Sequence, residues 1–441
     1  METKPYSQYK DSKIKWIGKL PYPWKEHKLI YSLKKITDGS HSSVPFIENG
    51  YPFVTVKNID KYTETINFQE CKKISKENYN ILVRNGCKPN KGDILFSQIG
   101  TIGLTIIVKE DIDFVILSSL AILKPQNNID KKYLKYFLQS NLIKNLCNYF
   151  MAGGAVKRIT LNHISNFIFF EPPLEEQEHI AKYLDTKTTK IEQTITKNKQ
   201  LITLLKEKRT TLINQTVTKG LNPDIPMKES GIEWIGKIPE NWEIIRAKFL
   251  FKQRTDKGNN IQLQLLSSTQ KFGVIPQELY EELSGMSAVK VKEDNDLSSF
   301  KCIHKNDYCI SLRSFEGGFE FCEYEGVVSP AYSVFYPNLK INKIYYKYLF
   351  KEYCFIDNMK SYCMSLRDGK NISFENFANS YIPYPPLETQ NKIGKLLDNK
   401  IKVIDKTIEK IEKNIELLEE YKESLIHHVV TGKIDVRGVE V

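Results

Sequence analysis

Residues 10–21 read KDSKIKWIGKLP and residues 228–239 read KESGIEWIGKIP, so one stretch of the chain occurs twice. Trp24 follows the first copy and Trp242 follows the second, which places all four tryptophans of the protein in this repeated element. The copies are 218 residues apart. A repeat at this distance predicts two structural units of the same kind, although 441 residues alone would suggest about three domains.

Two further pairs of segments continue the repeat at a slightly smaller distance. Residues 129–136 (IDKKYLKY) correspond to 341–348 (INKIYYKY), and residues 172–177 (PPLEEQ) correspond to 385–390 (PPLETQ). Between these anchors, in roughly residues 30–120 and 250–330, the two halves diverge strongly. We therefore expect shared frames that enclose two different inserts, which is one architecture with two recognition surfaces.

A long segment after each Pro-Pro pair is almost free of helix-breaking residues. Residues 174–219 contain neither glycine nor proline, and residues 387–431 contain only Gly394. Apolar residues recur at spacings of three, four or seven, which is the seam of a coiled coil. They are Ile180, Leu184, Ile191, Ile195, Ile202, Leu205 and Leu212 in the first segment and Ile404, Ile408, Ile411, Ile415, Leu418 and Leu425 in the second. The pattern predicts helices over 174–219 and 387–432, each about 68 Å long, with Gly220 and Gly432 as helix stops.

Two helices of matching length and seam within one chain are natural partners for each other. Because the chain crosses a whole globular unit between them, antiparallel pairing is favoured over parallel or independent packing, and it would place the two units at opposite ends of a rod. The predicted fold class is α+β with a pseudo-two-fold internal repeat. It consists of two mixed α/β domains (1–173 and 220–386), an intramolecular coiled coil of the two helices, and a tail (433–441).

Shorter elements are expected inside the two domains. Runs rich in β-branched and aromatic residues predict strands at 51–56, 93–97, 114–117 and 332–336. Helical patterns are present at 133–145 and 345–357. Each domain should therefore combine strands with short helices.

The charge of the chain favours a nucleic-acid partner or an acidic membrane surface. It carries 64 Lys and Arg against 53 Asp and Glu, a net charge of +11. Residues 1–173 hold 25 basic and 15 acidic side chains, whereas residues 220–386 hold 20 and 21. The longest mostly apolar run, 114–123, is too short to span a bilayer. Eight scattered cysteines without a C-x-x-C pair indicate reduced thiols, so a soluble, cytoplasmic protein is expected.

The sequence lacks the common motifs of catalysis. There is no GxxxxGK[ST], GxGxxG, HExxH or GxSxG. The histidines show no metal-ligand spacing, and His427-His428 near a helix end indicates a cation–dipole interaction instead. Residues 329–332 (SPAY) are similar to the base-holding motif of amino-methyltransferases, but the glycine-rich cofactor loop of that family is missing, so a strand entry after a turn is the better interpretation. We expect no catalytic residue and no metal site in this chain.

The repeated frames, divergent inserts and two long helices together resemble the specificity subunit of type I restriction-modification enzymes. The matching residues are WIG at 16–18 with Trp24, WIG at 234–236 with Trp242, and the two helix starts at 172–177 and 385–390. Residues 92–97 (GDILFS) with 100–103 (GTIG) look like a family turn in the first half, and residues 265–275 (LLSSTQKFGVI) look like one in the second. The resemblance covers nearly the whole chain.

In that family two target-recognition domains each read one half of a split DNA sequence, while the helices form a spacer and dock the methyltransferase subunits. The resemblance implies a non-catalytic chain that binds double-stranded DNA, two methyltransferase subunits and, in complexes that cleave, two restriction subunits. The assembled complex would be a type I site-specific deoxyribonuclease and DNA adenine methyltransferase. S-adenosylmethionine, ATP and Mg would bind to the partner subunits, with no cofactor on this chain. The alternative is a coiled-coil scaffold with two protein-binding heads and no DNA role.

Residues that contact DNA are expected among basic, amide and hydroxyl side chains. The candidates in the first domain are Ser40, His41, Lys57, Asn58, Ser97, Gln98, Thr101, Lys157 and Arg158. Gly153-Gly154 would permit a close approach of the backbone to a phosphate. The candidates in the second domain are Ser268, Thr269, Gln270, Lys271, Arg313, Arg367 and Lys370. Replacing Arg313 should cost about 1–3 kcal/mol of binding free energy if it reads a guanine.

Overall fold

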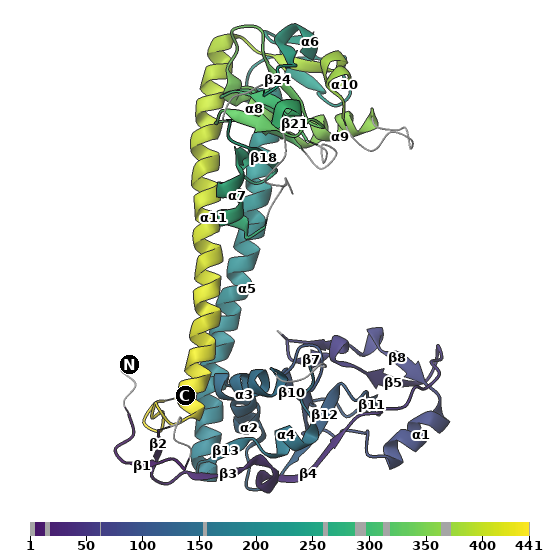
Figure 1. The fold of residues 1–441 in the computed structure, drawn as a ribbon, viewed down its shortest axis with the longest axis vertical. Helices are drawn as coiled ribbons and strands as arrows, with labels where there is room; N and C mark the ends of the chain where they lie inside the picture. The colour runs from purple at the N-terminus through teal and green to yellow at the C-terminus, as the bar shows by residue number, and fades with distance from the viewer. Residues whose placement is uncertain are drawn as a thin grey trace. The chain divides into compact units, whose positions relative to one another are not determined.

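The computed structural model describes residues 5–13, 18–61, 63–152, 157–258, 263–286, 297–311, 318–362 and 372–440. The chain folds into two compact units, in which residues 1–199 with 412–441 form unit 1 and residues 200–411 form unit 2 (Figure 1). Two long helices, α5 (Leu174–Lys219) and α11 (Leu387–Val430), each contribute one segment to each unit. None of the described helices is both long and apolar enough to cross a membrane.

Each unit contains the same small-sheet frame, built around one copy of the repeated stretch. In unit 1, β1 (Tyr9–Asp11) pairs with β2 (Lys19–Pro21), and β3 (Lys25–Lys28) pairs with β13 (Ile168–Glu171). In unit 2 the corresponding antiparallel pairs are β14 (Met227–Glu229) with β15 (Lys237–Pro239), and β16 (Glu243–Arg246) with β25 (Tyr381–Tyr384). The repeat of the sequence is therefore also a repeat of strand pairing.

A buried tryptophan holds each frame on the rest of its unit. Trp24 and Trp242 are almost completely buried. Each indole lies edge-on to a tyrosine ring of the same unit, Tyr133 or Tyr345, with 6.5 Å between centroids in both cases. The Trp24 indole Nε1 also donates a hydrogen bond to the carboxylate of Glu176 in the first turn of α5, at 2.9 Å. Large buried rings of this kind dominate the apolar surface that folding removes from water.

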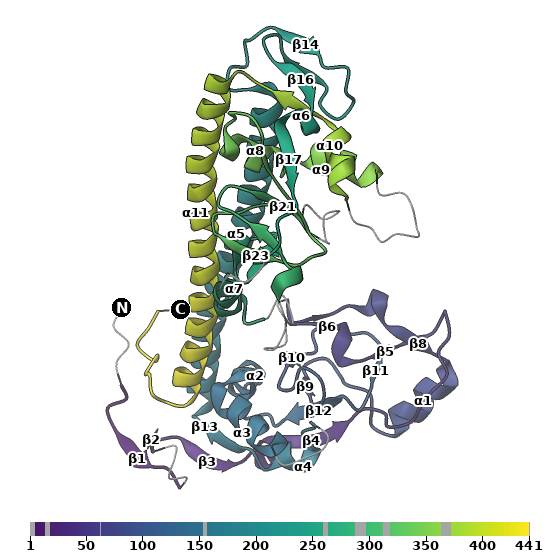
Figure 2. The same ribbon diagram turned by 45° about the horizontal axis from the view of Figure 1, so that its top comes forward.

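A four-stranded antiparallel sheet with the same strand order forms the centre of both domains, and Figure 2 labels the four strands of the unit 1 sheet. In unit 1 the order is β10 (Thr105–Ile107), β9 (Ile94–Ser97), β12 (Leu120–Pro125) and β4 (Leu33–Asp38). In unit 2 it is β22 (Phe319–Phe321), β21 (Tyr308–Ile310), β24 (Ser333–Pro337) and β17 (Phe251–Arg254). The diverging sequences therefore contribute to one common sheet.

The two domains differ in what they add to that sheet. Unit 1 adds a sheet of β11 (Val115–Ile116), β5 (Tyr51–Val54) and β8 (Lys72–Ile74), the pair β6 (Ile59–Asp60) and β7 (Thr65–Ile66), and helix α1 (Lys76–Arg84). Unit 2 adds the pairs β18 (Leu266–Thr269) with β19 (Gly273–Pro276) and β20 (Lys301–Ile303) with β23 (Gly326–Val328), and helix α7 (Gln277–Ser284). Its helix α10 (Phe374–Asn379) precedes β25 as α4 (Leu161–Ser165) precedes β13, and α6 (Ala247–Leu250) precedes β17 as the 3-10 helix Leu29–Ser32 precedes β4, so these elements are counterparts. The strands predicted at 51–56, 93–97, 114–117 and 332–336 correspond to β5, β9, β11 and β24.

The helices predicted at 133–145 and 345–357 are each two helices. α2 (Lys131–Gln139) and α3 (Asn141–Met151) are separated by Ser140, whose backbone is extended. α8 (Lys343–Leu349) and α9 (Tyr353–Ser361) are separated by three residues, and the Glu352 carboxylate caps α9 by accepting a hydrogen bond from the Phe355 N–H at 2.6 Å. The prediction was wrong here because apolar residues continue across both breaks, and periodicity alone does not reveal a cap.

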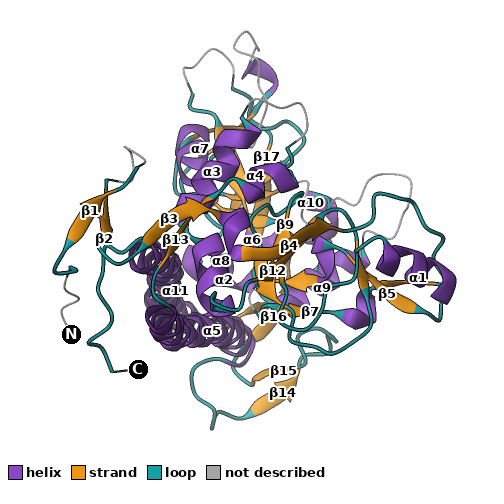
Figure 3. Cartoon of the chain, turned by 90° about the horizontal axis from the view of Figure 1, so that it is seen from below, coloured by secondary structure: helices purple, strands orange, loops and turns teal. Residues whose placement is uncertain are grey.

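Within each unit, a segment of α5 lies beside a segment of α11 (Figures 1 and 3). In unit 1, Glu192 forms an ion pair with Lys422, and His179 Nε2 lies 2.7 Å from the Val436 carbonyl oxygen beyond the end of α11. Residue numbers therefore fall along one segment as they rise along the other, so the two segments of unit 1 run antiparallel. In unit 2, Arg209 Nε lies 3.1 Å from Asp405 Oδ1.

The residues of the predicted seam are buried or half-buried. Its buried members are Ile180, Leu184, Ile191, Ile195, Ile202, Ile404, Ile408, Ile415 and Leu425, and its half-buried members are Leu205, Leu212, Ile411 and Leu418. α5 ends at Lys219 as expected, whereas α11 ends at Val430, two residues before the predicted end. Each compact unit includes a segment of both long helices, whereas the sequence predicted domains that are separate from the helices. The predicted domain boundaries therefore stay a prediction.

His427 does not act as the predicted cation at the end of α11. Burial, with smaller contributions from the charges of Lys433 and His428, lowers the pKa of His427 to about 4. The imidazole is therefore neutral near pH 7 and cannot form a charge–dipole interaction. The pKa of His428 is also lowered, again mainly by burial. The sequence interpretation was based on the position near a helix end, which does not reveal the burial that lowers both pKa values.

Candidate nucleic-acid interface

The central sheet of unit 1 brings distant candidate residues to one edge. β4 and β9 both run antiparallel to β12, with Asp38 opposite Ala121 and Ser97 opposite Leu120. The carboxyl ends of β4 and β9 therefore meet beside the start of β12. Ser40 and His41 follow β4, and Gln98 follows β9, so the sheet places these three predicted residues at the same edge. The end of the central sheet of unit 1 that holds Ser40, His41 and Gln98 is called the strand-end site.

A carboxylate links two basic residues at the strand-end site. Asp38 Oδ2 lies 2.7 Å from His41 Nε2 and 3.6 Å from Arg158 Nη2. The next residue, Ile159, donates its N–H to the Gln98 carbonyl at 3.0 Å, which holds the Arg158 segment against the end of β9. His41, Gln98 and Arg158 are thus brought together, and Asp38 is the residue that sequence reasoning missed. One signal could have revealed it, because Thr37-Asp38 returns as Thr255-Asp256 in the second half.

Several polar atoms of the strand-end site have no partner among the described residues. Gln98 is fully buried, yet neither of its amide atoms makes a hydrogen bond. Arg158 Nε and the hydroxyl of Ser119, whose carbonyl accepts from the Gln98 N–H at 2.8 Å, are also buried without a partner. An unsatisfied buried polar group costs about 1–3 kcal/mol. The exposed His41 and the half-buried Arg158 are the side chains of this site that can reach phosphate oxygens or base edges.

Other candidates of the first domain have structural partners. Ser97 is fully buried, and its hydroxyl donates to the Thr101 carbonyl and accepts from the Leu104 N–H. Asn58 Oδ1 accepts from the Thr55 N–H and hydroxyl, both at 2.9 Å. The side chains of Ser97 and Asn58 therefore stabilise local turns of the first domain.

The remaining first-domain candidates divide by exposure. Lys57, Thr101 and Lys157 are exposed, and Lys157 directly precedes Arg158. Ser40 is buried, and its hydroxyl donates to the Ser42 carbonyl and accepts from the Ser42 N–H, both at 3.1 Å. Gly153-Gly154 lies outside the described residues.

In the second domain, four candidates lie on one hairpin. Ser268 and Thr269 end β18, and Gln270 and Lys271 form the exposed turn before β19. The Thr269 hydroxyl accepts from the Phe272 N–H and donates to the Gly273 carbonyl, both at 3.0 Å, so it stabilises the turn. Arg313, Arg367 and Lys370 lie outside the described residues. Gln270 and Lys271 are therefore the exposed candidates that the structure describes in this domain.

The second domain also places a paired arginine at its strand ends, and sequence reasoning missed it. Arg254 closes β17, and its Nη1 lies 3.2 Å from Asp256 Oδ2, the counterpart of Asp38. Its Nε lies 2.7 Å from Asp307 Oδ2, and its guanidinium carbon is 4.5 Å from the centroid of the Tyr336 ring. Each domain therefore has an Asp–Arg pair near the end of its edge strand, but the arginines come from different places, since Arg158 follows α3 and Arg254 lies in β17. Among the described residues, no three His, Cys, Asp or Glu side chains form a group that could hold a metal ion.

Comparison with known proteins agrees with this repeated arrangement. Residues 45–203 and 239–417 match the family model described as the type I restriction modification DNA specificity domain. Over 97% of its length, the chain is 27% identical to a protein of Methanocaldococcus jannaschii named as a type I restriction enzyme MjaX specificity subunit, of which 98% is covered. The family match alone includes more than half of the chain.

Solved structures resemble this chain in fold along most of its length. One comes from work on complex assembly and conformational transition of the type I R-M system; its TM-score is 0.67 at 15% identity, covering 94% of this chain and 99% of that chain. Another is the HsdS subunit from Thermoanaerobacter tengcongensis, with a TM-score of 0.51 at 15% identity, covering 94% of this chain and 98% of that one. The matched residues and the repeated domain structure lead to one conclusion: the chain belongs to the family of type I restriction-modification DNA specificity subunits.

Proposed function

We propose that each of the two domains reads one half of a bipartite DNA sequence. The observation that carries this proposal is the duplicated four-stranded sheet with an Asp–Arg pair at its strand ends, Asp38 with Arg158 and Asp256 with Arg254. An arginine can bind phosphate or the O6 and N7 atoms of guanine, and a carboxylate beside it restricts its orientation. In unit 1 the exposed His41, which lies beside Asp38, adds a second side chain that can reach DNA.

The helix pair is proposed to set the separation of the two half-sites. The buried seam and the Glu192–Lys422 and Arg209–Asp405 ion pairs support an antiparallel intramolecular coiled coil. A helix of fixed length is a stiff spacer, since each residue adds about 1.5 Å. The length of the helices would then determine how many unread base pairs lie between the half-sites.

The chain is proposed to act without catalysing a reaction itself. In this account its helices dock two methyltransferase subunits, and two restriction subunits join where the complex cleaves DNA. Adenine methylation and cleavage would then depend on S-adenosylmethionine, ATP and Mg bound by those partners, in the cytoplasm. The family assignment supports this division of labour.

Binding to DNA separates this proposal from a scaffold with two protein-binding heads. The complex of the full chain with its methyltransferase partner should bind a duplex that carries the motif methylated in the host. That binding should weaken steeply as salt increases, because phosphate contacts release counterions. Equal affinity for this duplex and for one of scrambled sequence would favour the scaffold.

Arg158 should contribute measurably to DNA binding. Replacing it with alanine is expected to weaken binding by the equivalent of about 1–3 kcal/mol. If Arg158 contacts a phosphate, all sequences should lose affinity and the salt slope should fall by about one; if it reads a base, discrimination at one position should be lost. Fluorescence anisotropy with duplexes substituted at each motif position measures both. Arg84→Ala, an exposed charge removed from α1 of the same domain, is the matched control, and an equal loss in both variants would contradict a local role for Arg158.

A further inference from the structure

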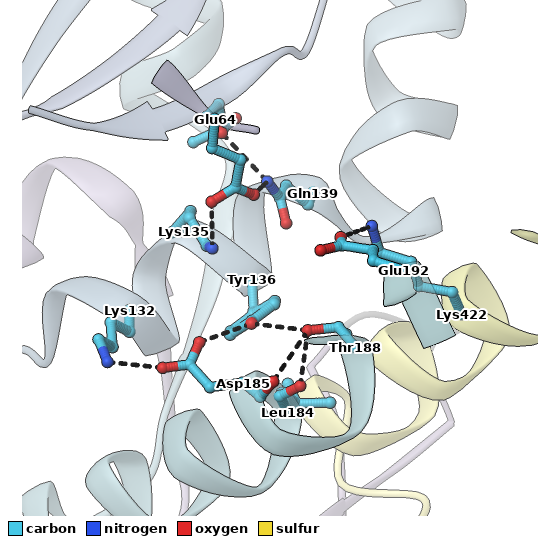
Figure 4. A network of polar contacts seen from close by, with 11 residues as sticks. Glu64, Lys132, Lys135, Tyr136, Gln139, Leu184, Asp185, Thr188, Glu192 and Lys422 are labelled. Carbon is cyan, nitrogen blue, oxygen red and sulfur yellow. Dashed lines mark hydrogen bonds and ion pairs between the residues drawn. The ribbon is translucent and has the colours of Figure 1, made fainter. Parts of the chain in front are cut away.

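A turn of the first insert is tied to helix α2 by one carboxylate. Lys135 Nζ lies 2.7 Å from Glu64 Oε2, and Gln139 Nε2 donates to Glu64 Oε1 at 3.0 Å (Figure 4). Lys135 is only 6% exposed, so its ammonium depends on this partner. Glu64 has a backbone φ of 51°, a conformation that is uncommon for residues other than glycine. Such a conformation persists where surrounding contacts hold it.

The same helix continues this network to the long helices of unit 1. The Tyr136 hydroxyl donates to Asp185 Oδ1 of α5 at 2.7 Å and lies 3.1 Å from the Thr188 hydroxyl. Lys132 Nζ lies 2.6 Å from Asp185 Oδ2. Further along α5, Glu192 pairs with Lys422 of α11, as Figure 4 also shows. Polar contacts therefore join the Glu64 turn to α2, and α2 to α5.

In unit 2, the residues that correspond to Lys135 and Gln139 also pair with carboxylates. Lys347 and Lys351 correspond to Lys135 and Gln139 in the aligned repeats. Lys351 Nζ lies 2.5 Å from Glu320 Oε1, whose residue is only 2% exposed, and Lys347 Nζ lies 3.5 Å from Glu323 Oε1. The contact to a long helix recurs as well, on α11 instead of α5, because the hydroxyl of Tyr348, the counterpart of Tyr136, donates to Asp398 at 3.4 Å.

The carboxylates come from different elements in the two units. Glu64 lies in the turn between β6 and β7, whereas Glu320 lies in the middle of β22. Common descent of one strand therefore does not explain the recurrence. Buried ion pairs add little net stability over apolar packing, but their energy depends strongly on geometry. A contact that recurs on unrelated elements, and is sensitive to geometry, is suited to fixing the orientation of each insert on its helix.

We propose that Glu64 and Glu320 are positioning residues. Each holds the divergent part of its recognition domain on the repeated segment (131–139 or 343–351) that contacts a long helix, so that the complex accepts only one distance between the half-sites. The inference rests on the proposed function, since it concerns the spacing of a bipartite target. Neither residue is expected to contact DNA.

The test measures how strongly methylation depends on the number of base pairs between the half-sites. The full chain, wild type or variant, is expressed with its methyltransferase partner in cells that carry plasmids whose gap is one base pair shorter, unchanged or one base pair longer. Sequencing of methylated bases then gives the ratio of methylation at altered gaps to that at the native gap. Glu64→Gln should raise this ratio about tenfold, the effect of losing one hydrogen bond to a charged group. Glu320→Gln should act in the same direction.

Two further variants make the result decisive. Glu48→Gln removes an equal charge from an exposed position of the same domain, so its ratio should equal that of the wild type. Gln139→Ala removes one contact to Glu64 without leaving Lys135 unpaired, and it replaces Glu64→Gln if thermal unfolding shows that the latter does not fold. A wild-type ratio in the Glu64 or Gln139 variant would overturn the inference. Methylation by the wild-type complex without preference for any gap would instead overturn the proposed function, and this inference with it.

Discussion

Inserting one heptad into both long helices should lengthen the gap between the recognised half-sites by about three base pairs. Seven residues extend a helix by about 10 Å, and each base pair adds about 3.4 Å to a duplex. The insertions belong between Glu192 and Arg209 in α5 and between Asp405 and Lys422 in α11, because the ion pairs of these residues identify the facing segments. A whole heptad keeps the apolar seam in register. The gap is read by sequencing methylated bases in cells that express the variant.

A heptad inserted into α5 alone is the control for this experiment. It should shift the seam of one helix against the other and reduce methylation at every gap, rather than select a new one. If the doubly extended chain still methylates the original motif with its original gap, helix length does not set the spacing, and the spacer role would have to be abandoned.

Replacing Gly432 with alanine should strongly destabilise the frame of unit 1. Gly432 has a φ of +71°, and a Cβ there would lie 2.4 Å from Pro21 Cδ and Cγ and 3.5 Å from Trp24. A left-handed conformation costs a residue with a Cβ about 1–2 kcal/mol, and overpacking adds about 1–3 kcal/mol. We therefore expect a loss of about 2–5 kcal/mol in the free energy of unfolding of this part. Urea unfolding followed by tryptophan fluorescence reports it, because the tryptophans lie in the frames.

Gly220 is the matched control at the end of the other helix. Its φ is +80°, but a Cβ would lie 3.4 Å from Trp242 and 3.7 Å from Pro239, which is close to ordinary contact. Gly220→Ala should therefore cost only the conformational part, about 1–2 kcal/mol. Equal losses of unfolding free energy in the two variants would show that the clash of a Cβ at position 432 with Pro21 does not add to the destabilisation.

The frames and the long helices could be predicted from the sequence because their signals are local. Residues 174–219 contain no helix breaker, and α5 has these same bounds. The repeated tryptophans mark two frames whose strands pair in the same way. Heptad spacing likewise identified residues that are buried or half-buried between the helices.

The common central sheet could not be predicted, because short buried strands are constrained mainly to be apolar. β9 and β21 occupy equivalent places, yet Ile94-Leu95-Phe96 and Tyr308-Cys309-Ile310 are identical at none of the three aligned positions. The helix break at Ser140 was not predicted either. The Ser140 side chain makes no capping hydrogen bond in the structure.

The candidate site was only partly predictable. His41, Gln98 and Arg158 have the side chains that bind DNA, so their chemistry alone selected them. Asp38 is a carboxylate far from Arg158 in sequence; the return of Thr37-Asp38 as Thr255-Asp256 marks the residue, but its proximity to Arg158 is seen only where the strand ends meet. Conversely, Ser97 and Asn58 have suitable side chains but use them in turns of the domain. Residue type predicts which groups can bind DNA, whereas the sheet determines which of them remain available.

Sequencing the methylated bases of host cells, with and without the gene for this chain, tests the central claim most directly. The account predicts one motif that consists of two specified halves separated by a gap of fixed length, and loss of methylation at that motif when the chain is removed. A continuous motif, or methylation that persists without the chain, would contradict the claim that its two domains read a bipartite target.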